Sequence, residues 1–328
     1  MALLSGIKGQ DNAVRYLTRS MEKGRLSASY LFSGPRGVGR ALCARAFLKS
    51  LICKDESAKG DPSCRCPSCA RVDANEHPDI RWIKPAKNKS IKIEEIRGIK
   101  DFLSLKPFES PLSAAVIEDA HMMTTDASNA LLKVLEEPPG DSTIILISDK
   151  KELLLATVVS RCSEVRFTPL SISDTKDIIM RNSDMDDKAA GFLAYLSQGS
   201  PGLALEMAKE GVAERRDGLA ENLVKLILEE NPALLNWDTE NKDELIEDIE
   251  SMIMFLRDVA LEREGLGDMV LDKDLMEKAG KRMPSEKGID GIYRVVDRLI
   301  GIKRALVGNV NPKIVAQALP GILAGMNA

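Results

Sequence analysis

Short apolar runs alternate with helical patterns through the first half of the chain. Five runs have the length and composition of buried strands: 29–33, 79–83, 114–117, 143–147 and 164–167. Between them apolar residues recur at helical spacing, and Thr124 offers an N-cap for a helix that Pro138 must end. Strands that alternate with helices in this way predict a parallel α/β sheet.

The pattern changes after Pro169. Three short helices are predicted at 172–181, 186–198 and 201–209, and beyond residue 212 only helical periodicity is found. No internal repeat or low-complexity tract appears. We therefore expect three parts, which are an α/β domain, a small three-helix domain and an all-helical domain, at 1–168, 169–210 and 211–328.

Composition narrows the class of protein. The chain has 328 residues, of which 44% are apolar and 4% aromatic, and a formal charge of −4, so an electrostatic nucleic-acid binder is not expected. The amino terminus has no signal-peptide pattern, and no apolar stretch approaches the roughly 20 residues that cross a bilayer. We expect a cytoplasmic protein without membrane contact, whose six cysteines are reduced.

A glycine-rich segment follows the first predicted strand. Gly34, Gly37, Gly39, Arg40 and Ala41 have the spacing of the phosphate-binding pattern G-x-x-x-x-G-K-[ST]. However, arginine stands at the lysine position, and alanine at the hydroxyl position cannot ligate Mg²⁺. We predict a phosphate loop that has lost hydrolysis and does not bind ATP productively. The alternative is a glycine-rich turn without any nucleotide role.

Two acidic residues end the third predicted strand. A nucleotide site would place Asp-Glu there, to supply a Mg²⁺ ligand and to orient water. Glu118 and Asp119 stand in the opposite order. They are candidate cofactor-site residues, and the alternative is an acidic pair at the surface.

Three segments resemble the landmarks of clamp-loader AAA+ subunits. They are 115–121 (AVIEDAH), 129–139 (NALLKVLEEPP) and 160–162 (SRC), in the family's order and spacing. The resemblance implies an AAA+ phosphate-loop domain, a three-helix lid at 169–210 and a helical oligomerisation collar at 211–328. It also implies that Arg161 acts in trans on the ATP of a neighbouring subunit, where such arginines are worth about 10³–10⁵ in rate.

Within this family the chain resembles the delta-prime type more than the gamma/tau motor type. Gly202 stands where motor subunits carry the second sensor arginine, and Ser148 and Asp149 stand at the first sensor. The resemblance implies a non-hydrolysing stator of the DNA polymerase III clamp loader. Its partners would be gamma/tau and delta subunits and, transiently, the sliding clamp, with primed DNA reached through the complex. An active motor subunit and a zinc-containing nucleic-acid-binding module are the alternatives.

Four cysteines cluster in a polar insertion at 53–69 after the phosphate-loop helix. Cys53, Cys64, Cys66 and Cys69 can supply four thiolates for a structural Zn²⁺, since clustered cysteines in a reducing compartment favour a metal. The family pattern has C-x-x-C-x-x-C, whereas here the first gap is one residue shorter. His77 is an alternative fourth ligand, and free thiols are the alternative to a metal.

Overall fold

The computed structural model describes residues 4, 6–55, 63–86, 89–229, 241–278, 280–282, 289–308 and 310–324. Part of the predicted cysteine insertion, 56–62, lies outside the described residues. The chain divides into two compact units, Met1–Thr175 with Gly199–Gly202, and Lys176–Gln198 with Leu203–Ala328. Each unit has its own buried apolar core.

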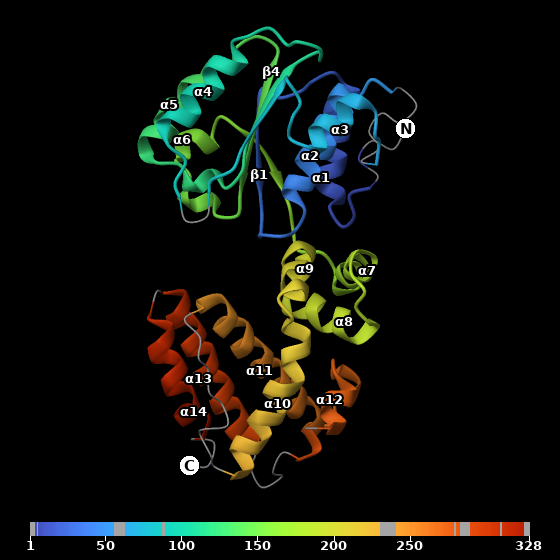
Figure 1. Ribbon diagram of the computed structural model, residues 1–328, viewed down its shortest axis with the longest axis vertical. Helices are drawn as coiled ribbons and strands as arrows, with labels where there is room; N and C mark the ends of the chain where they lie inside the picture. Colours follow the sequence, from blue (N-terminus) through green and yellow to red (C-terminus); the bar gives the residue numbers. More distant parts are fainter. Residues whose placement is uncertain are drawn as a thin grey trace. The chain divides into compact units, whose positions relative to one another are not determined.

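The first unit is built on a five-stranded sheet of order β2-β3-β4-β1-β5, in which every neighbouring pair is parallel. The strands are β1 (Ser29–Ser33), β2 (Ile80–Ile83), β3 (Ser113–Ile117), β4 (Ser142–Ser148) and β5 (Ser163–Arg166). The helices are α1 (Asp11–Glu22), α2 (Arg40–Ile52), α3 (Pro67–Asp73), α4 (Ile93–Leu103), α5 (Thr125–Glu136) and α6 (Ala156–Val159), with 3₁₀ turns η1 (Ala120–Met122) and η2 (Lys151–Leu153). Figure 1 shows α1, α2 and α3 on one side of the sheet and α4, α5 and α6 on the other.

These elements follow from the apolar pattern. Every residue of β1 and β3 is buried, as expected of parallel strands covered on both faces. The side chain of Thr124 caps α5 by accepting the N–H of Ala127 at 3.2 Å, and the helix ends before Pro138. The predicted parallel α/β sheet is therefore confirmed, with the five strand boundaries shifted by at most one residue.

Three helices of this unit, α1, α3 and the four-residue α6, were not predicted. In α1 apolar residues stand at helical spacing, at 13, 14, 17 and 21, so the pattern was present although only Ala13 and Leu17 are buried. The helix α3 has seven residues, too few for periodicity to be read, and begins at Pro67.

We expect Phe47→Ala to lower the free energy of unfolding by about 3–5 kcal/mol. Phe47 is fully buried on α2 and stacks edge-to-face with Tyr30, the ring centroids 5.4 Å apart. Urea denaturation measures the change, and Phe108→Ala is the control because that ring is 84% exposed. Equal losses for the two variants would contradict the assignment of this core.

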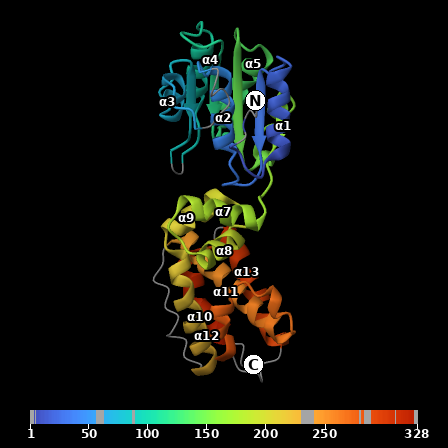
Figure 2. The same cartoon turned by 90° about the vertical axis from the view of Figure 1, so that its right-hand side faces the viewer.

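The second unit is helical. Two helices, α7 (Ile172–Asn182) and α9 (Pro201–Lys209), begin in the first unit and continue in the second. The other elements of the second unit are α8 (Asp187–Leu196), α10 (Val212–Glu229), α11 (Lys242–Arg263), η4 (Gly267–Met269), α12 (Lys273–Lys278), η5 (Gly280–Arg282), α13 (Ile289–Val307) and α14 (Pro312–Ala324). Figure 2 shows α10, α11 and α13 side by side, and their buried residues form one cluster around Leu256 and Leu299. A second cluster around Phe192 joins α8 and α9.

The helical carboxyl-terminal region is thus confirmed, while its division into lid and collar stays a prediction. Within the described ranges, none of the helices has the length and apolar character needed to cross a membrane.

Candidate functional site

The glycine-rich segment lies between β1 and α2, where a phosphate loop must lie. Its three glycines have positive φ values, 144° at Gly34, 80° at Gly37 and 96° at Gly39. A side chain at Gly34 would place its Cβ 2.3 Å from the carbonyl oxygen of Phe167. Glycine is therefore required by the backbone itself, whether or not a phosphate binds.

The backbone of Gly202 closes on this loop. Its N–H donates to the carbonyl oxygen of Gly37 at 2.8 Å. A Cβ at position 202 would lie 2.9 Å from the Cα and 3.0 Å from the oxygen of Gly37. Since such contacts require one backbone to move, an arginine at this position is incompatible with the observed loop.

Gln10 fastens the loop from the amino-terminal segment. Its Nε2 donates to the carbonyl oxygens of Val38 and Thr168, at 3.2 and 2.7 Å, and its Oε1 accepts the N–H of Thr168 at 3.2 Å. The sequence did not single out Gln10, because a lone glutamine carries no signal until its burial is known.

Arg40 is surrounded by the protein's own charges. It opens α2, is 7% exposed, and its Nη1 has no hydrogen-bond partner among the described residues. Burial lowers the pKa of its guanidinium, whereas Asp149, Asp119 and Glu118 oppose that shift. The cation at the lysine position is therefore balanced by carboxylates of the same chain.

Glu118 and Asp119, the two acidic residues that follow β3, interact with neighbouring side chains of the same chain. Glu118 accepts a hydrogen bond from Trp82 Nε1 at 2.8 Å and pairs with Lys84 at 3.2 Å. Asp119 has a left-handed backbone, φ 48°, and its carboxylate forms a compact group with His121 and Asp149, with ligand atoms within 4.8 Å. This group could hold a cation, but the charge of Arg40 beside it already offsets the carboxylates.

We expect Gly202→Ala to lower the free energy of unfolding by about 1–3 kcal/mol, because the added methyl group overlaps Gly37. Thermal denaturation measures this loss. Gly191→Ala is the matched control, since its Cβ would meet only the Lys176 side chain at 3.9 Å. An unchanged midpoint for Gly202→Ala would show that the loop is not closed in this way.

Arg161 lies one residue beyond the cap of α6. Its Nη2 pairs with Glu136 at 2.6 Å and its Nη1 donates to the carbonyl oxygen of Thr157 at 2.9 Å. Its own carbonyl oxygen accepts the hydroxyl of Ser29 at 2.8 Å. From the sequence Glu136 is known only as part of the segment 129–139, because residue spacing does not show which glutamate of that segment contacts Arg161.

Arg161 and the phosphate loop lie at opposite ends of β1. Arg161 contacts Ser29 where β1 begins, while the loop follows Ser33 where β1 ends. At 3.3 Å per residue these two ends of β1 are about 13 Å apart. The backbone of Arg161 thus lies at the end of β1 that is opposite to the chain's own phosphate loop.

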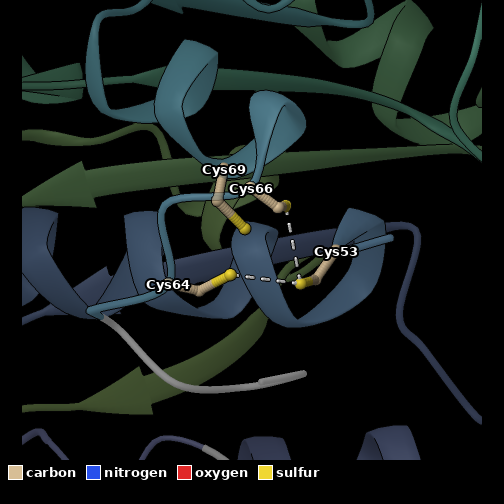
Figure 3. A group of neighbouring side chains, drawn as sticks. All are labelled: Cys53, Cys64, Cys66 and Cys69. Carbon is tan, nitrogen blue, oxygen red and sulfur yellow. Dashed lines mark hydrogen bonds between the residues drawn. The ribbon is translucent and has the colours of Figure 1, made fainter. Parts of the chain in front are cut away.

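The four predicted cysteines come together (Figure 3). Cys53 caps the end of α2, Cys64 precedes α3, and Cys66 and Cys69 lie at its start. Their sulfurs lie within 4.8 Å of one another, with 3.7 Å between Cys53 and Cys64 and 3.9 Å between Cys53 and Cys66. Zn–S bonds of 2.3 Å in a tetrahedron put sulfurs about 3.8 Å apart, so this set fits a metal ion.

The short gap between Cys64 and Cys66 does not prevent this arrangement. Cys66 has an extended backbone, φ −58° and ψ 156°, just before α3 starts, which turns its thiol toward Cys53. Burial opposes its ionisation, but hydrogen bonds from the Cys69 and Lys54 backbone and from neighbouring thiols lower its pKa to about 6. A thiolate is thus available at neutral pH.

His77 has a different role from the one considered for it. Its Nδ1 accepts the N–H of Asp79 at 3.1 Å, so the proton of the neutral ring lies on Nε2, which faces Ser68 at 3.0 Å and Glu109 at 3.3 Å. Burial lowers the pKa of the ring, which favours this neutral form. Both nitrogens are engaged, and the cysteine cluster is complete without His77.

Comparison with known proteins identifies the family. The sequence model of a family described as DNA polymerase III, delta subunit, matches residues 9–171. DNA polymerase III subunit delta' of Bacillus subtilis is 33% identical over 218 residues, which are 66% of this chain and 63% of that protein. The chain belongs to the delta-prime family of clamp-loader subunits. Its fold is accordingly the AAA+ fold, with a parallel sheet followed by helices.

Other relatives of this delta-prime family member include further clamp-loader proteins. Subunit delta' of Pseudomonas aeruginosa is 30% identical and covers 64% of this chain and 66% of its own length. Subunit tau of B. subtilis is 25% identical over 94% of this chain and 59% of its own length. A gamma subunit-related structure from Thermotoga maritima covers 97% of this chain and all of its own at 20% identity and a TM-score of 0.48.

Proposed function

We propose that this chain is a non-hydrolysing stator of the DNA polymerase III clamp loader. The position of Arg161 carries the proposal, because it lies a whole strand length from the chain's own phosphate loop. That loop is closed by Gly202 and has Ala41 at the magnesium-ligand position. The chain's part in ATP chemistry is then to supply Arg161 to the site of a neighbouring subunit.

The cysteine centre holds a structural Zn²⁺ in this proposal. Four thiolates at tetrahedral spacing leave no open position for a substrate, which is the arrangement of structural rather than catalytic zinc. The metal would close the insertion at 53–69 onto α2, where Lys49 already pairs with Asp73 of α3 at 2.8 Å.

The proposed partners are gamma/tau and delta subunits, and transiently the sliding clamp, in the cytoplasm where primed DNA is found. Helices α10 to α14 would form the collar that joins the subunits, and α7 to α9 the lid. Mixing the purified chain with gamma/tau and delta subunits tests this assembly. We expect one complex in sedimentation, with faster ATP hydrolysis than the motor subunits show alone; failure to assemble would contradict the proposal.

An active motor subunit is the second candidate, because the match to subunit tau of B. subtilis covers 94% of this chain. A motor needs a phosphate loop that opens to Mg-ATP. Turnover of ATP by the isolated chain separates the two candidates: the stator gives none, and a motor gives measurable hydrolysis.

A further inference from the structure

The segment 104–111 between α4 and β3, which we name the Phe108 loop, presents two bare apolar side chains. Phe108 is 84% exposed and Leu105 is 67% exposed, the two highest values among the large apolar side chains of the described residues. Exposing an aromatic ring of this size to water costs free energy, and a partner that covers the ring removes that cost.

The backbone of this loop is fixed rather than frayed. The carboxylate of Asp79, 3% exposed, accepts the N–H groups of Phe108, Glu109 and Ser110 at 2.5, 2.9 and 2.8 Å. Burial alone would raise the pKa of Asp79, but these donors lower it, so the carboxylate stays ionised at neutral pH. The loop that carries the two exposed apolar side chains is therefore anchored by hydrogen bonds to Asp79.

Glu109 ties the same loop to the cysteine insertion. Its carboxylate pairs with Lys54 at 2.9 Å, with Arg71, and with Nε2 of His77 at 3.3 Å. Lys54 directly follows Cys53, and Arg71 lies on α3 two residues after Cys69. His77 also contacts Ser68, the neighbour of Cys69. The side-chain partners of Glu109 thus lie next to the cysteine insertion in the chain or contact a residue of it.

We propose that the cysteine centre braces the Phe108 loop as a docking knob for a protein with an apolar pocket and an acidic rim. Glu109 of this loop pairs with both Lys54 and Arg71, and Lys106 is exposed on the same loop, so these four groups together carry excess positive charge, which favours such a rim. Leu105 offers no surface for base stacking, which favours a protein over single-stranded nucleic acid. A fixed loop also loses little freedom on binding.

Hydrogen exchange of the full-length chain tests the brace. Removing the metal with a chelator is expected to speed exchange of the Phe108, Glu109 and Ser110 amides at least tenfold, while amides of β3 stay protected. Glu109→Gln should have the same effect with the metal still bound, and Glu76→Gln, an exposed neighbour of His77, should not. Unchanged exchange at the loop in both cases would overturn the brace.

Binding measurements test the knob with purified gamma/tau, delta, sliding clamp and primed DNA, each added separately. We expect Phe108→Ala to weaken binding to one of the proteins about thirtyfold, as loss of an aromatic anchor does, and Leu26→Ala to leave it unchanged. A loss confined to DNA, or no loss for any protein, would overturn the knob. The choice of probes rests on the proposed function, but the outcome does not depend on Arg161, so the two can fail separately.

Discussion

Arg161→Ala is expected to lower ATP hydrolysis at the one motor site that faces this chain by about 10³-fold or more. The guanidinium would contact the charge that develops on the transferred phosphoryl group, and alanine leaves that charge without its donor. Single-turnover hydrolysis in the assembled complex measures the effect, since the other sites continue to turn over. The isolated motor subunits should be unaffected.

Two controls make this result specific. Arg161→Lys keeps the charge but loses the planar fork, so we expect only part of the rate to return. Arg166→Ala removes a neighbouring arginine of β5 that pairs with Glu164 at 3.3 Å and should leave hydrolysis unchanged. An Arg161→Ala complex that hydrolyses ATP at the full rate at every site would contradict the trans role.

Cys69→Ser is expected to weaken zinc binding more than about 100-fold. Loss of a metal ligand costs more affinity than loss of a residue that only hydrogen-bonds to a ligand. Cys69 is fully buried among the other thiols, so the hydroxyl that replaces its sulfur has no exit to water. Since metal binding is coupled to folding, the insertion should also lose protection from proteolysis. Metal analysis and limited proteolysis measure the two effects.

The control for this change is Cys43→Ala. Cys43 is buried on α2 outside the four-cysteine set, and burial raises its pKa to about 12, so it behaves as a small apolar residue. We expect one zinc per chain in this variant and the wild type alike. A wild-type chain purified without zinc that also fails to take it up would contradict the proposed metal site.

The sequence allowed much of the first unit to be predicted, because its strands are apolar runs bounded by clear breaks. Thr124 and Pro138 marked the limits of α5, and the glycines marked the turn into α2. The helix α3 escaped prediction because it is short, whereas α1 carries apolar residues at helical spacing, at 13, 14, 17 and 21, and could have been predicted. Helical periodicity can be recognised only in a segment that is long enough to repeat its apolar positions.

The candidate site was predictable by residue type but not by contact. Spacing indicated the loop, the cysteines and Arg161. It could not show that Gly202 donates to Gly37, that Glu136 pairs with Arg161, or that Glu109 links the cysteine insertion to the Phe108 loop. These contacts join residues that are far apart in the chain, so only the fold brings them together.

In the proposed stator the phosphate loop no longer takes part in ATP chemistry. Titration of the isolated, zinc-loaded chain with Mg-ATP, followed by calorimetry, tests this most directly. The closed loop, the alanine at position 41 and the internally balanced Arg40 predict no binding heat up to millimolar nucleotide. Saturable binding with a micromolar dissociation constant would show that the loop still takes nucleotide.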